Sequence, residues 1–212
     1  DIVVLAGDIF DNDYDALDDP DRLCELLGSM NSRYGTYGCY GNHDIEERLL
    51  GGFSVDFNNN NLRDEKMEDF MKKTGIHMLL DECILIDNSF YLAGRLDIEK
   101  PGSANIDKRL TANELLEGID YSKPVIVMDH QPKKLKELAN AGCDLDLSGH
   151  THDGQLFPGN VVSGIVCENV CGLKTVGNMT SVVTAGVGLW GPNMRVGTTA
   201  DITVVNVNFN NN

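Results

Sequence analysis

Four apolar, β-rich runs in this chain end in short polar motifs, and no other feature of the sequence constrains the fold as strongly. In open α/β sheets the ligand site lies beyond the carboxyl ends of the strands. We therefore expect the side chains of these motifs to meet at one edge of one sheet and to form a single site there. The four motifs are Ala6-Gly7-Asp8, Gly41-Asn42-His43-Asp44, Met128-Asp129-His130 and Ser148-Gly149-His150-Thr151-His152.

The rest of the chain alternates short strands with amphipathic helices. The run 125–129 is apolar and typical of a buried parallel strand, whereas the three runs between residues 76 and 94 are short and are predicted to pair antiparallel. Helices are predicted from Pro20 after the N-cap Asp19, over 62–74 with Gly75 as C-cap, from the capping box at 111–114, and over 132–141. Strands are predicted over 2–6, 36–40, 76–80, 83–86, 90–94, 125–129 and 144–148, and near 181–185 and 202–207.

This order of elements predicts an α/β sandwich with mixed sheets. A chain of 212 residues is long enough for one domain with a hydrophobic core. The formal charge of −16 argues against general binding to a nucleic-acid polymer, which needs clustered Lys and Arg. An acidic chain can still act on phosphorylated substrates where bound cations supply positive charge locally.

The cysteines and the lengths of the apolar runs indicate in which cellular compartment the chain is expected. Six cysteines are too sparse for a disulfide framework, so we predict free thiols in a reducing compartment. Cys167 and Cys171 are four positions apart, but no second pair completes a zinc site. No apolar run approaches the roughly 20 residues that span a bilayer. Cytoplasmic and membrane-associated locations both stay open, with any membrane tether expected outside this chain.

The histidines point to the chemistry. His150 and His152 are two positions apart, so in an extended backbone their side chains face the same side. Imidazole is both the commonest metal ligand and the usual acid–base group near neutral pH, and this stretch alone leaves both roles open. Each motif taken singly also fits a turn or a loop residue. A shared site is favoured because four of the five histidines follow strand ends; His77, within an apolar strand, is predicted to be structural.

The order of the motifs closely resembles that of the calcineurin-like metallophosphoesterase family. The resemblance covers nearly the whole chain, and as a set the motifs are highly specific. It implies a four-layer α-β-β-α sandwich with two mixed sheets, formed by a single domain over residues 1–212. The matching motifs are Gly7-Asp8-Ile9-Phe10-Asp11, Gly41-Asn42-His43-Asp44, His130 and Gly149-His150-Thr151-His152.

The resemblance also implies a role for each motif residue. Asp8 would bridge two divalent metal ions, with Mn the first choice among Mn, Fe, Zn and Ni, which suit oxygen and imidazole ligands. His43 would contact the phosphate and protonate the leaving oxygen, and Asp11 would orient the His43 ring. A metal-bridging hydroxide would then attack phosphorus in line. The remaining ligands are Asn42, His130 and His150 on one metal and His152 on the other.

The chain departs from the family pattern in two places. The family opens with a DxH motif on an earlier strand, which supplies two ligands to the metal held by His152. This chain begins at the next strand, so we expect the DxH strand upstream and regard the domain as N-terminally truncated, with one metal site incomplete. The second departure is Asp153, where the nearest branch of the family has glycine. It is interpreted either as a group near the metals and substrate or as a solvated loop residue.

The GHTHxGQ motif, with Val187-Gly188-Leu189-Trp190 and Arg195, is similar to a branch of single-domain, often membrane-tethered phosphoesterases. That branch acts on phosphodiesters or pyrophosphates of lipid-linked or nucleotide-linked molecules, so the implied partner is a small phosphorylated substrate. Trp190 would stack on such a substrate or pack internally.

Two alternatives to this function remain. A phosphomonoesterase or phosphoprotein phosphatase is disfavoured because no arginine follows Asp11 or Asp44, as it does in the family's protein phosphatases. A non-catalytic scaffold on the same fold is disfavoured because both His43 and Asp11 are present.

Overall fold

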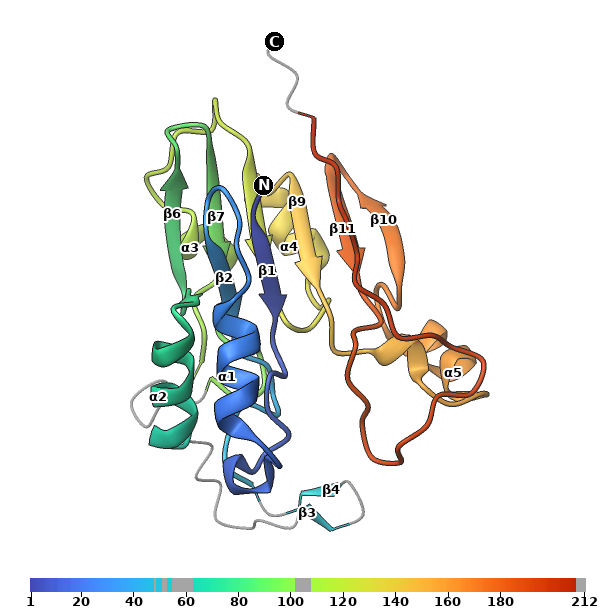
Figure 1. The fold of residues 1–212 in the computed structure, drawn as a ribbon. Helices are drawn as coiled ribbons and strands as arrows, with labels where there is room; N and C mark the ends of the chain where they lie inside the picture. The colour runs from blue at the N-terminus through green and yellow to red at the C-terminus, as the bar shows by residue number, and fades with distance from the viewer. Residues whose placement is uncertain (48, 51–52, 55–62, 102–107, 209–212) are drawn as a thin grey trace.

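Two β-sheets pack against each other and carry helices on their outer faces (Figure 1). This arrangement confirms the expected four-layer α-β-β-α sandwich. The structure is a computed structural model, and it describes residues 1–47, 49–50, 53–54, 63–101 and 108–208.

The smaller sheet is parallel throughout. Its strand order is β1-β2-β5, with Val3 paired to Thr36 and Tyr37 paired to His77. Helices α1 and α2 cover its outer face, and their apolar sides pack on residues of β1 and β5 such as Leu5 and Met78. The bounds are β1 Val3–Ala6, β2 Thr36–Cys39, β5 His77–Met78, α1 Pro20–Gly28 and α2 Glu65–Thr74.

The larger sheet is mixed. Its order is β10-β11-β9-β8-β7-β6, in which the four central strands are parallel and the two edge strands are antiparallel to their neighbours. Helices α3 and α4 cover its outer face. The bounds are β6 Glu82–Ile86, β7 Phe90–Gly94, β8 Val125–Met128, β9 Leu145–Ser148, β10 Gly172–Val176, β11 Met179–Val183, α3 Ala112–Leu115 and α4 Leu135–Asn140.

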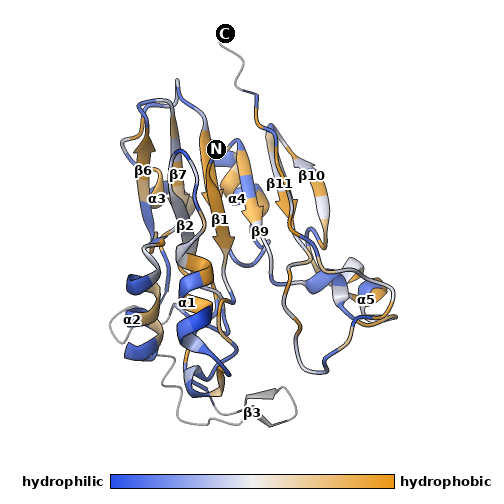
Figure 2. Ribbon diagram, viewed as in Figure 1, coloured by the Kyte–Doolittle hydropathy of each residue, from blue (hydrophilic) through white to orange (hydrophobic). Residues whose placement is uncertain are grey.

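Apolar side chains fill the space between each pair of layers. One cluster lies between the two sheets and includes Cys39, Leu92 and Met128, all fully buried. The other two lie between each sheet and its helices. In Figure 2 the strands are largely hydrophobic, while α1 and α2 carry both hydrophobic and hydrophilic residues, as expected for helices with one buried side.

Local capping chemistry explains where the main helices begin and end. The carboxylate of Asp19 accepts the backbone N–H of Arg22 at 3.0 Å, and Pro20 is the first residue of α1. Helix α2 ends at Gly75, whose φ of 71° lies in the left-handed region that glycine adopts without strain. Thr111 and Glu114 form the predicted capping box of α3.

Several sequence-based boundaries were wrong. The residues around His77 join the smaller sheet in parallel instead of extending the β6–β7 hairpin. Helix α4 begins at Leu135 and not at 132, because Lys134 has a left-handed φ of 58°. Residues 202–207 form no strand, since no strand of the described chain pairs with them, and Ile202 and Val204 are more than 80% exposed.

The sequence analysis also missed some elements. Helix α5 and strand β10 were not anticipated, because Gly and Val are weak helix formers and the region was expected to be extended. The missed elements are α5 Gly159–Val166, β10 Gly172–Val176, the 3-10 turns Tyr14–Ala16 and His152–Gly154, and a two-stranded ribbon of β3 Leu49–Leu50 and β4 Phe53–Ser54.

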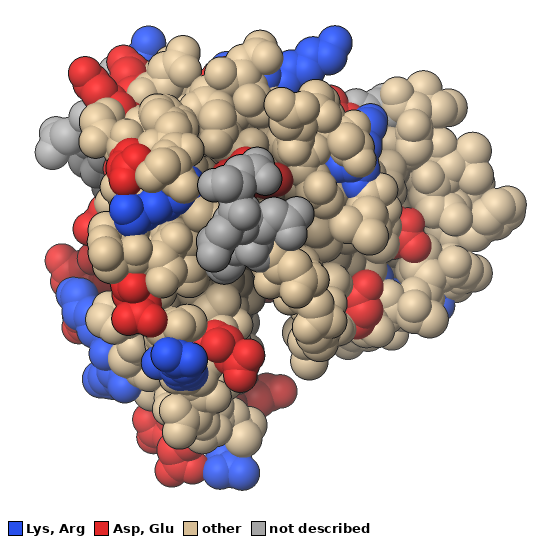
Figure 3. Space-filling model, turned by 90° about the horizontal axis from the view of Figure 1, so that it is seen from above, with Lys and Arg blue, Asp and Glu red and all other residues tan. Residues whose placement is uncertain are grey.

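Helix α5 differs from the other helices in its surface. It contains no Asp, Glu, Lys or Arg, and Val161, Val162 and Ile165 are exposed. Seen from above, the side of the molecule that carries β10 and α5 shows few charged side chains, while acidic groups gather on the opposite side (Figure 3). Within the described residues, no helix combines the length and hydropathy that a bilayer crossing requires. The cysteines of the described chain are free thiols.

Two buried acidic groups lie within the larger sheet's core. Asp129 is ion-paired with Arg109 at 2.7 Å and with Arg95 at 3.3 Å, so its charge is compensated. Asp146 is fully buried on β9 and accepts hydrogen bonds from the hydroxyls of Ser148 and Ser181, at 2.7 to 3.1 Å. Burial, followed by the negative charge of Asp129, raises the pKa of Asp146 to about 7.

This raised pKa predicts a pH dependence of stability. Between the unfolded pKa of about 3.9 and the native value, the folded chain holds a proton that the unfolded chain has released. The free energy of unfolding should therefore fall as pH rises from about 4 to 7, by up to about 4 kcal/mol from this group at about 1.4 kcal/mol per pKa unit. Asp146→Asn should reduce that slope by the share of this group in urea titrations across this pH range. The exposed control Asp18→Asn should keep it, and an unchanged slope in Asp146→Asn would contradict the assignment.

Candidate metal centre

The four polar motifs meet at the carboxyl ends of strands from both sheets. Asp8 follows β1 and Asn42 follows β2 in the smaller sheet, while His130 follows β8 and His150 follows β9 in the larger one. The expectation that a single sheet edge carries the site was wrong. The strands pair within two separate sheets, and the packing of those sheets through their shared apolar layer brings the two edges together.

His130 is the centre of this group. Its Nε2 lies 3.0 Å from Oδ2 of Asp8, 3.1 Å from Oδ1 of Asn42 and 3.2 Å from Nδ1 of His150. Its other nitrogen, Nδ1, lies 2.7 Å from the carbonyl oxygen of Ala6, which can only accept, so Nδ1 carries a proton and donates it. A ligating imidazole is commonly fixed in this way by a backbone carbonyl, which leaves Nε2 as the ligand atom.

The charges of the group are strongly coupled. Burial alone would lower the pKa of His130, but the charge and the hydrogen bond of Asp8 outweigh it and raise the pKa to about 9. Burial alone would raise the pKa of Asp8, and the same contact with His130 lowers it to about 2. Burial and the positive charge of His130 lower the pKa of His150 to about 4, so this ring is neutral and able to coordinate.

These donors fit a divalent metal ion. One ligand atom each from Asp8, His130 and His150 lies within 4.8 Å of the other two, and Oδ1 of Asn42 is adjacent. A carboxylate, an amide oxygen and two imidazoles form the donor set that first-row divalent ions accept. The structure thus brings together four of the five predicted metal ligands.

His152, the fifth, lies outside that group. Its Nδ1 is buried without a hydrogen-bond partner in the described structure, and burial lowers the pKa of the ring. Its loop is fastened by Arg195, which donates to the carbonyl oxygen of His152 at 2.8 Å and to those of Ala185, Gly186 and Gly188 at 2.7 to 3.2 Å. Arg195 was noted in the sequence only as part of a motif, and this role was missed.

Asp44 was also missed, although it is the last letter of the GNHD motif. It is fully buried, and its two carboxylate oxygens accept four backbone N–H groups at 2.7 to 2.9 Å. Burial and the charge of Asp8 raise its pKa to about 7, and the N–H bonds act against that rise. This carboxylate joins the loop after β1 to the loop after β2. The four donors are the N–H groups of Asp8, Ile9, Phe10 and Gly41.

The two loops approach so closely that side chains are excluded between them. A Cβ on Gly41 would overlap Oδ1 of Asp8. Several site residues also have left-handed backbones, which cost non-glycine residues energy and are found mainly at functional sites. Their φ values are 53° for Asp8, 70° for His150, 50° for His152 and 53° for Asp153.

The predicted catalytic pair is arranged differently from the metal ligands. His43 is largely buried beside Asp8, whose Oδ1 accepts the backbone N–H of His43 at 2.9 Å. Oδ1 of Asp11 lies 3.5 Å from Nδ1 of the His43 ring, and the Asp11 side chain is 69% exposed. Oδ1 of Asn12, a residue to which the sequence gave no role, lies closer to that nitrogen.

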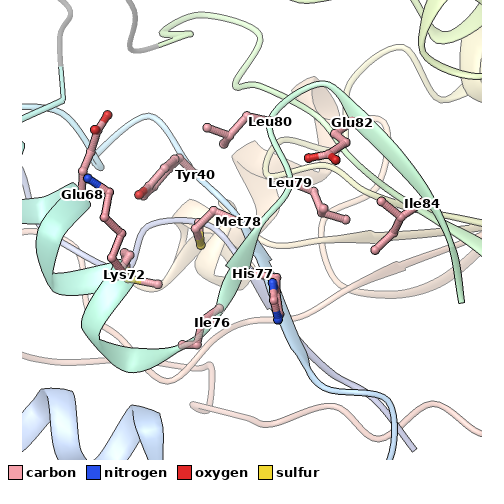
Figure 4. Close-up of a pocket in the computed structure, with 11 residues that line it drawn as sticks. Tyr40, Glu68, Lys72, Ile76, His77, Met78, Leu79, Leu80, Glu82 and Ile84 are labelled. Atoms are coloured by element: carbon pink, nitrogen blue, oxygen red, sulfur yellow. The ribbon is translucent and has the colours of Figure 1, made fainter.

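The other residues singled out from the sequence lie around this centre or away from it. Gln155 of the GHTHxGQ motif binds the backbone of Trp190 through both ends of its amide. Asp153 is half-buried in the 3-10 turn that contains His152. His77 is exposed on an edge strand and lines a separate hollow of about 430 Å³ between α2, β5 and β6, which none of the candidate ligands lines (Figure 4).

The family model described as calcineurin-like phosphoesterase matches residues 1–154, which include all the candidate ligands. The chain belongs to the calcineurin-like phosphoesterase family. Membership of this family supports a metal-dependent phosphoesterase in general, and Asp8, His130 and His150 form a possible metal-binding group.

Several relatives of this chain are named as metallophosphoesterases or as proteins with a metallophosphoesterase domain. An uncharacterized metallophosphoesterase of Aquifex aeolicus is 31% identical over 98% of this chain and 72% of its own length. An uncharacterized metallophosphoesterase of Campylobacter jejuni is 30% identical over 98% of this chain and 50% of its own. A bovine (Bos taurus) protein named transmembrane protein with metallophosphoesterase domain is 32% identical over 96% of this chain and 45% of its own length. The chain thus spans about half of the last two relatives, and no solved structure matches it.

The geometry predicts the effect of removing one ligand. His150→Ala should weaken the binding of Mn²⁺ or Zn²⁺ by roughly 100-fold or more, since losing only an outer-shell partner costs 10- to 100-fold. Calorimetric titration of metal into the chelator-treated chain measures this. His77→Ala, at an exposed histidine outside the centre, is the matched control, and equal affinities in the two variants would contradict the assignment of His150.

The Asp44 contacts predict a large effect on folding. Asp44→Asn would place an amide N–H₂ where the wild type has an acceptor facing two N–H donors. The free energy of unfolding of the metal-free chain should fall by about 3 kcal/mol, measured in urea, because buried donors lose a charged acceptor. Asp18→Asn, which changes an exposed carboxylate, should stay within about 0.5 kcal/mol of wild type. Equal losses in the two variants would show that the clamp contributes little.

Proposed function

We propose that this chain is the catalytic domain of a two-metal phosphoesterase that hydrolyses a phosphodiester or a pyrophosphate. The observation that carries the proposal is the convergence of Asp8, Asn42, His130 and His150 from two sheets on one point, in a chain of this family. Asp8 would hold both ions, Asn42, His130 and His150 the first, and His152 the second. Mn²⁺ is the proposed metal, since these donors suit borderline ions.

The chain's own residues would do the following work. Bound ions would supply positive charge for the phosphate and an activated water for in-line attack on phosphorus. His130 is fixed by Ala6, so its ligand atom faces Asp8 without rearrangement. His43, beside Asp8, would contact a phosphate oxygen and give a proton to the leaving oxygen, while Asp11 and the groups around the ring would orient it.

Two considerations favour diesters and pyrophosphates over monoesters. A monoester carries an additional negative charge that needs a further cation. The guanidinium of Arg195, which lies beside the His152 loop, already donates to four backbone carbonyls. The similarity to the GHTHxGQ branch further supports a small lipid-linked or nucleotide-linked substrate. We also propose a membrane tether outside this chain, as the name of the bovine relative suggests for that protein.

The second metal site is proposed to be completed by a strand that precedes this sequence in the full domain. Of the candidate ligands in this chain, only Asp8 and His152 are assigned to that ion in this proposal. A DxH-bearing strand would add the two further ligands that the family resemblance implies. On this proposal residues 1–212 are an N-terminally truncated single domain.

The test is Mn-dependent hydrolysis of bis(p-nitrophenyl) phosphate and of p-nitrophenyl phosphate. It compares this chain, a version extended upstream through the proposed strand, and His43→Ala in the extended version. We expect activity mainly in the extended form, stronger on the diester, and a loss of roughly 10²- to 10⁴-fold in His43→Ala, the range of acid–base catalysis.

His77→Ala in the extended version is the matched histidine control and should retain activity. An extended form that binds two metals and cleaves neither ester would contradict the proposed function and favour a non-catalytic scaffold. A clear preference for the monoester would favour the phosphomonoesterase alternative.

A further inference from the structure

The ring of His43 is held by a residue that neither the motif nor the family resemblance assigns. Oδ1 of Asn12 lies within hydrogen-bond distance of Nδ1 of His43, closer than Oδ1 of Asp11 at 3.5 Å. The Asp11 carboxylate is mostly exposed to solvent, which screens its charge, whereas Asn12 is fully buried. Asn12 is therefore better placed than Asp11 to fix the ring.

The hydrogen bonds of Asn12 decide which way its amide points. Its Nδ2 donates to the carbonyl oxygen of Ile45 at 3.3 Å and to Oε2 of Glu47 at 3.3 Å. Both partners are acceptors, so the amide nitrogen must face them and the oxygen must face His43. An amide oxygen can only accept, and Nδ1 of His43 must therefore carry the proton between them.

This arrangement is also rigid. The backbone N–H of Asn12 donates to the carbonyl oxygen of His43 at 2.9 Å, and the backbone N–H of Glu47 donates to the carbonyl oxygen of Asn12 at 3.1 Å. The carboxylate of Glu47 is in turn paired with Nζ of Lys100 at 2.5 Å, and its side chain is only 9% exposed. Asn12 adopts a left-handed φ of 61°, which Asn tolerates better than most residues. Lys100, Glu47 and Asn12 thus form a continuous support behind the ring.

We propose that Asn12 is the positioning residue of His43, and that it holds the ring as the Nδ1–H tautomer with Nε2 left for the substrate. The role in catalysis rests on the function proposed above. As an acid the ring would enter the step as the imidazolium, with a proton on each nitrogen. As the attacking water oxygen bonds to phosphorus and the bond between phosphorus and the leaving oxygen breaks, the Nε2 proton would move to the leaving oxygen, and the ring would be left as the neutral Nδ1–H tautomer bonded to Asn12. Because Asn12 is neutral, it orients the ring without placing a second negative charge beside Asp8.

The first test measures the tautomer without reference to activity. Two-bond ¹H–¹⁵N correlation spectra of the metal-free chain, recorded at alkaline pH where imidazoles are neutral, distinguish the two tautomers. The His43 signals are assigned by their loss in His43→Gln. We expect the Nδ1–H pattern in the wild type. An Nε2–H pattern for His43 overturns the proposal.

Two glycine variants, both at Asn residues with a positive φ, show whether the tautomer depends on the Asn12 side chain. Asn12→Gly removes the side chain at a backbone conformation that glycine prefers and should mix the tautomers. Asn88→Gly, at an exposed turn residue with a φ of 53°, should leave the His43 signals unchanged. A wild-type pattern in Asn12→Gly, or tautomer mixing in Asp11→Asn instead, overturns the proposal.

The second test separates positioning from general loss of structure. In the form of the protein that hydrolyses phosphodiesters, Asn12→Gly should lower kcat about 100-fold on an alkyl ester, whose poor leaving group needs a proton, and only a few-fold on the p-nitrophenyl ester. KM should be little changed on both. Equal losses on the two esters overturn the catalytic part of the proposal. Absence of hydrolysis in every form, with the expected tautomer, overturns the proposed function and leaves the ring's position standing.

Discussion

The carboxylate of Asp44 is the contact on which the geometry of the centre depends. Four backbone N–H groups from the loops after β1 and β2 donate to it. The two loops lie so close together that a side chain at Gly41 would overlap Asp8. Asp8 owes its left-handed backbone and its direction toward His130 to this fixed turn. The energy of the strained backbone is offset by charge-assisted hydrogen bonds that water cannot reach.

A comparable support lies beneath the ligands of the larger sheet. Asp129 precedes His130 and is held between the buried guanidinium groups of Arg95 and Arg109. Replacing such a buried pair by apolar residues is often neutral or stabilising, so stability alone does not explain why the chain uses charges there. The pairing fixes the backbone direction at the end of β8, and with it the point from which the His130 ring enters the site.

The sequence predicted the layers of the fold and the convergence of its polar motifs, because both follow from short-range patterns, namely apolar runs and the polar residues that end them. It could not predict that the ligands come from two sheets, since strand partners are chosen by packing between distant segments. Asp44 and Asn12 escaped notice because Asp and Asn are ordinary turn residues, and only their burial sets them apart. Helix α5 was missed because tertiary contacts override weak local propensities.

The candidate ligands come from both sheets, so a bound metal ion would also affect how the two sheets are held together. An ion held by Asp8 and His150, as proposed, would act as a cross-link between the two halves of the sandwich, which are otherwise joined mainly by apolar packing. Its binding energy is then also energy that holds the halves together, and it increases with the logarithm of the free metal concentration. The abundance of the folded protein would follow metal supply, so that metal starvation would remove the protein as well as its activity.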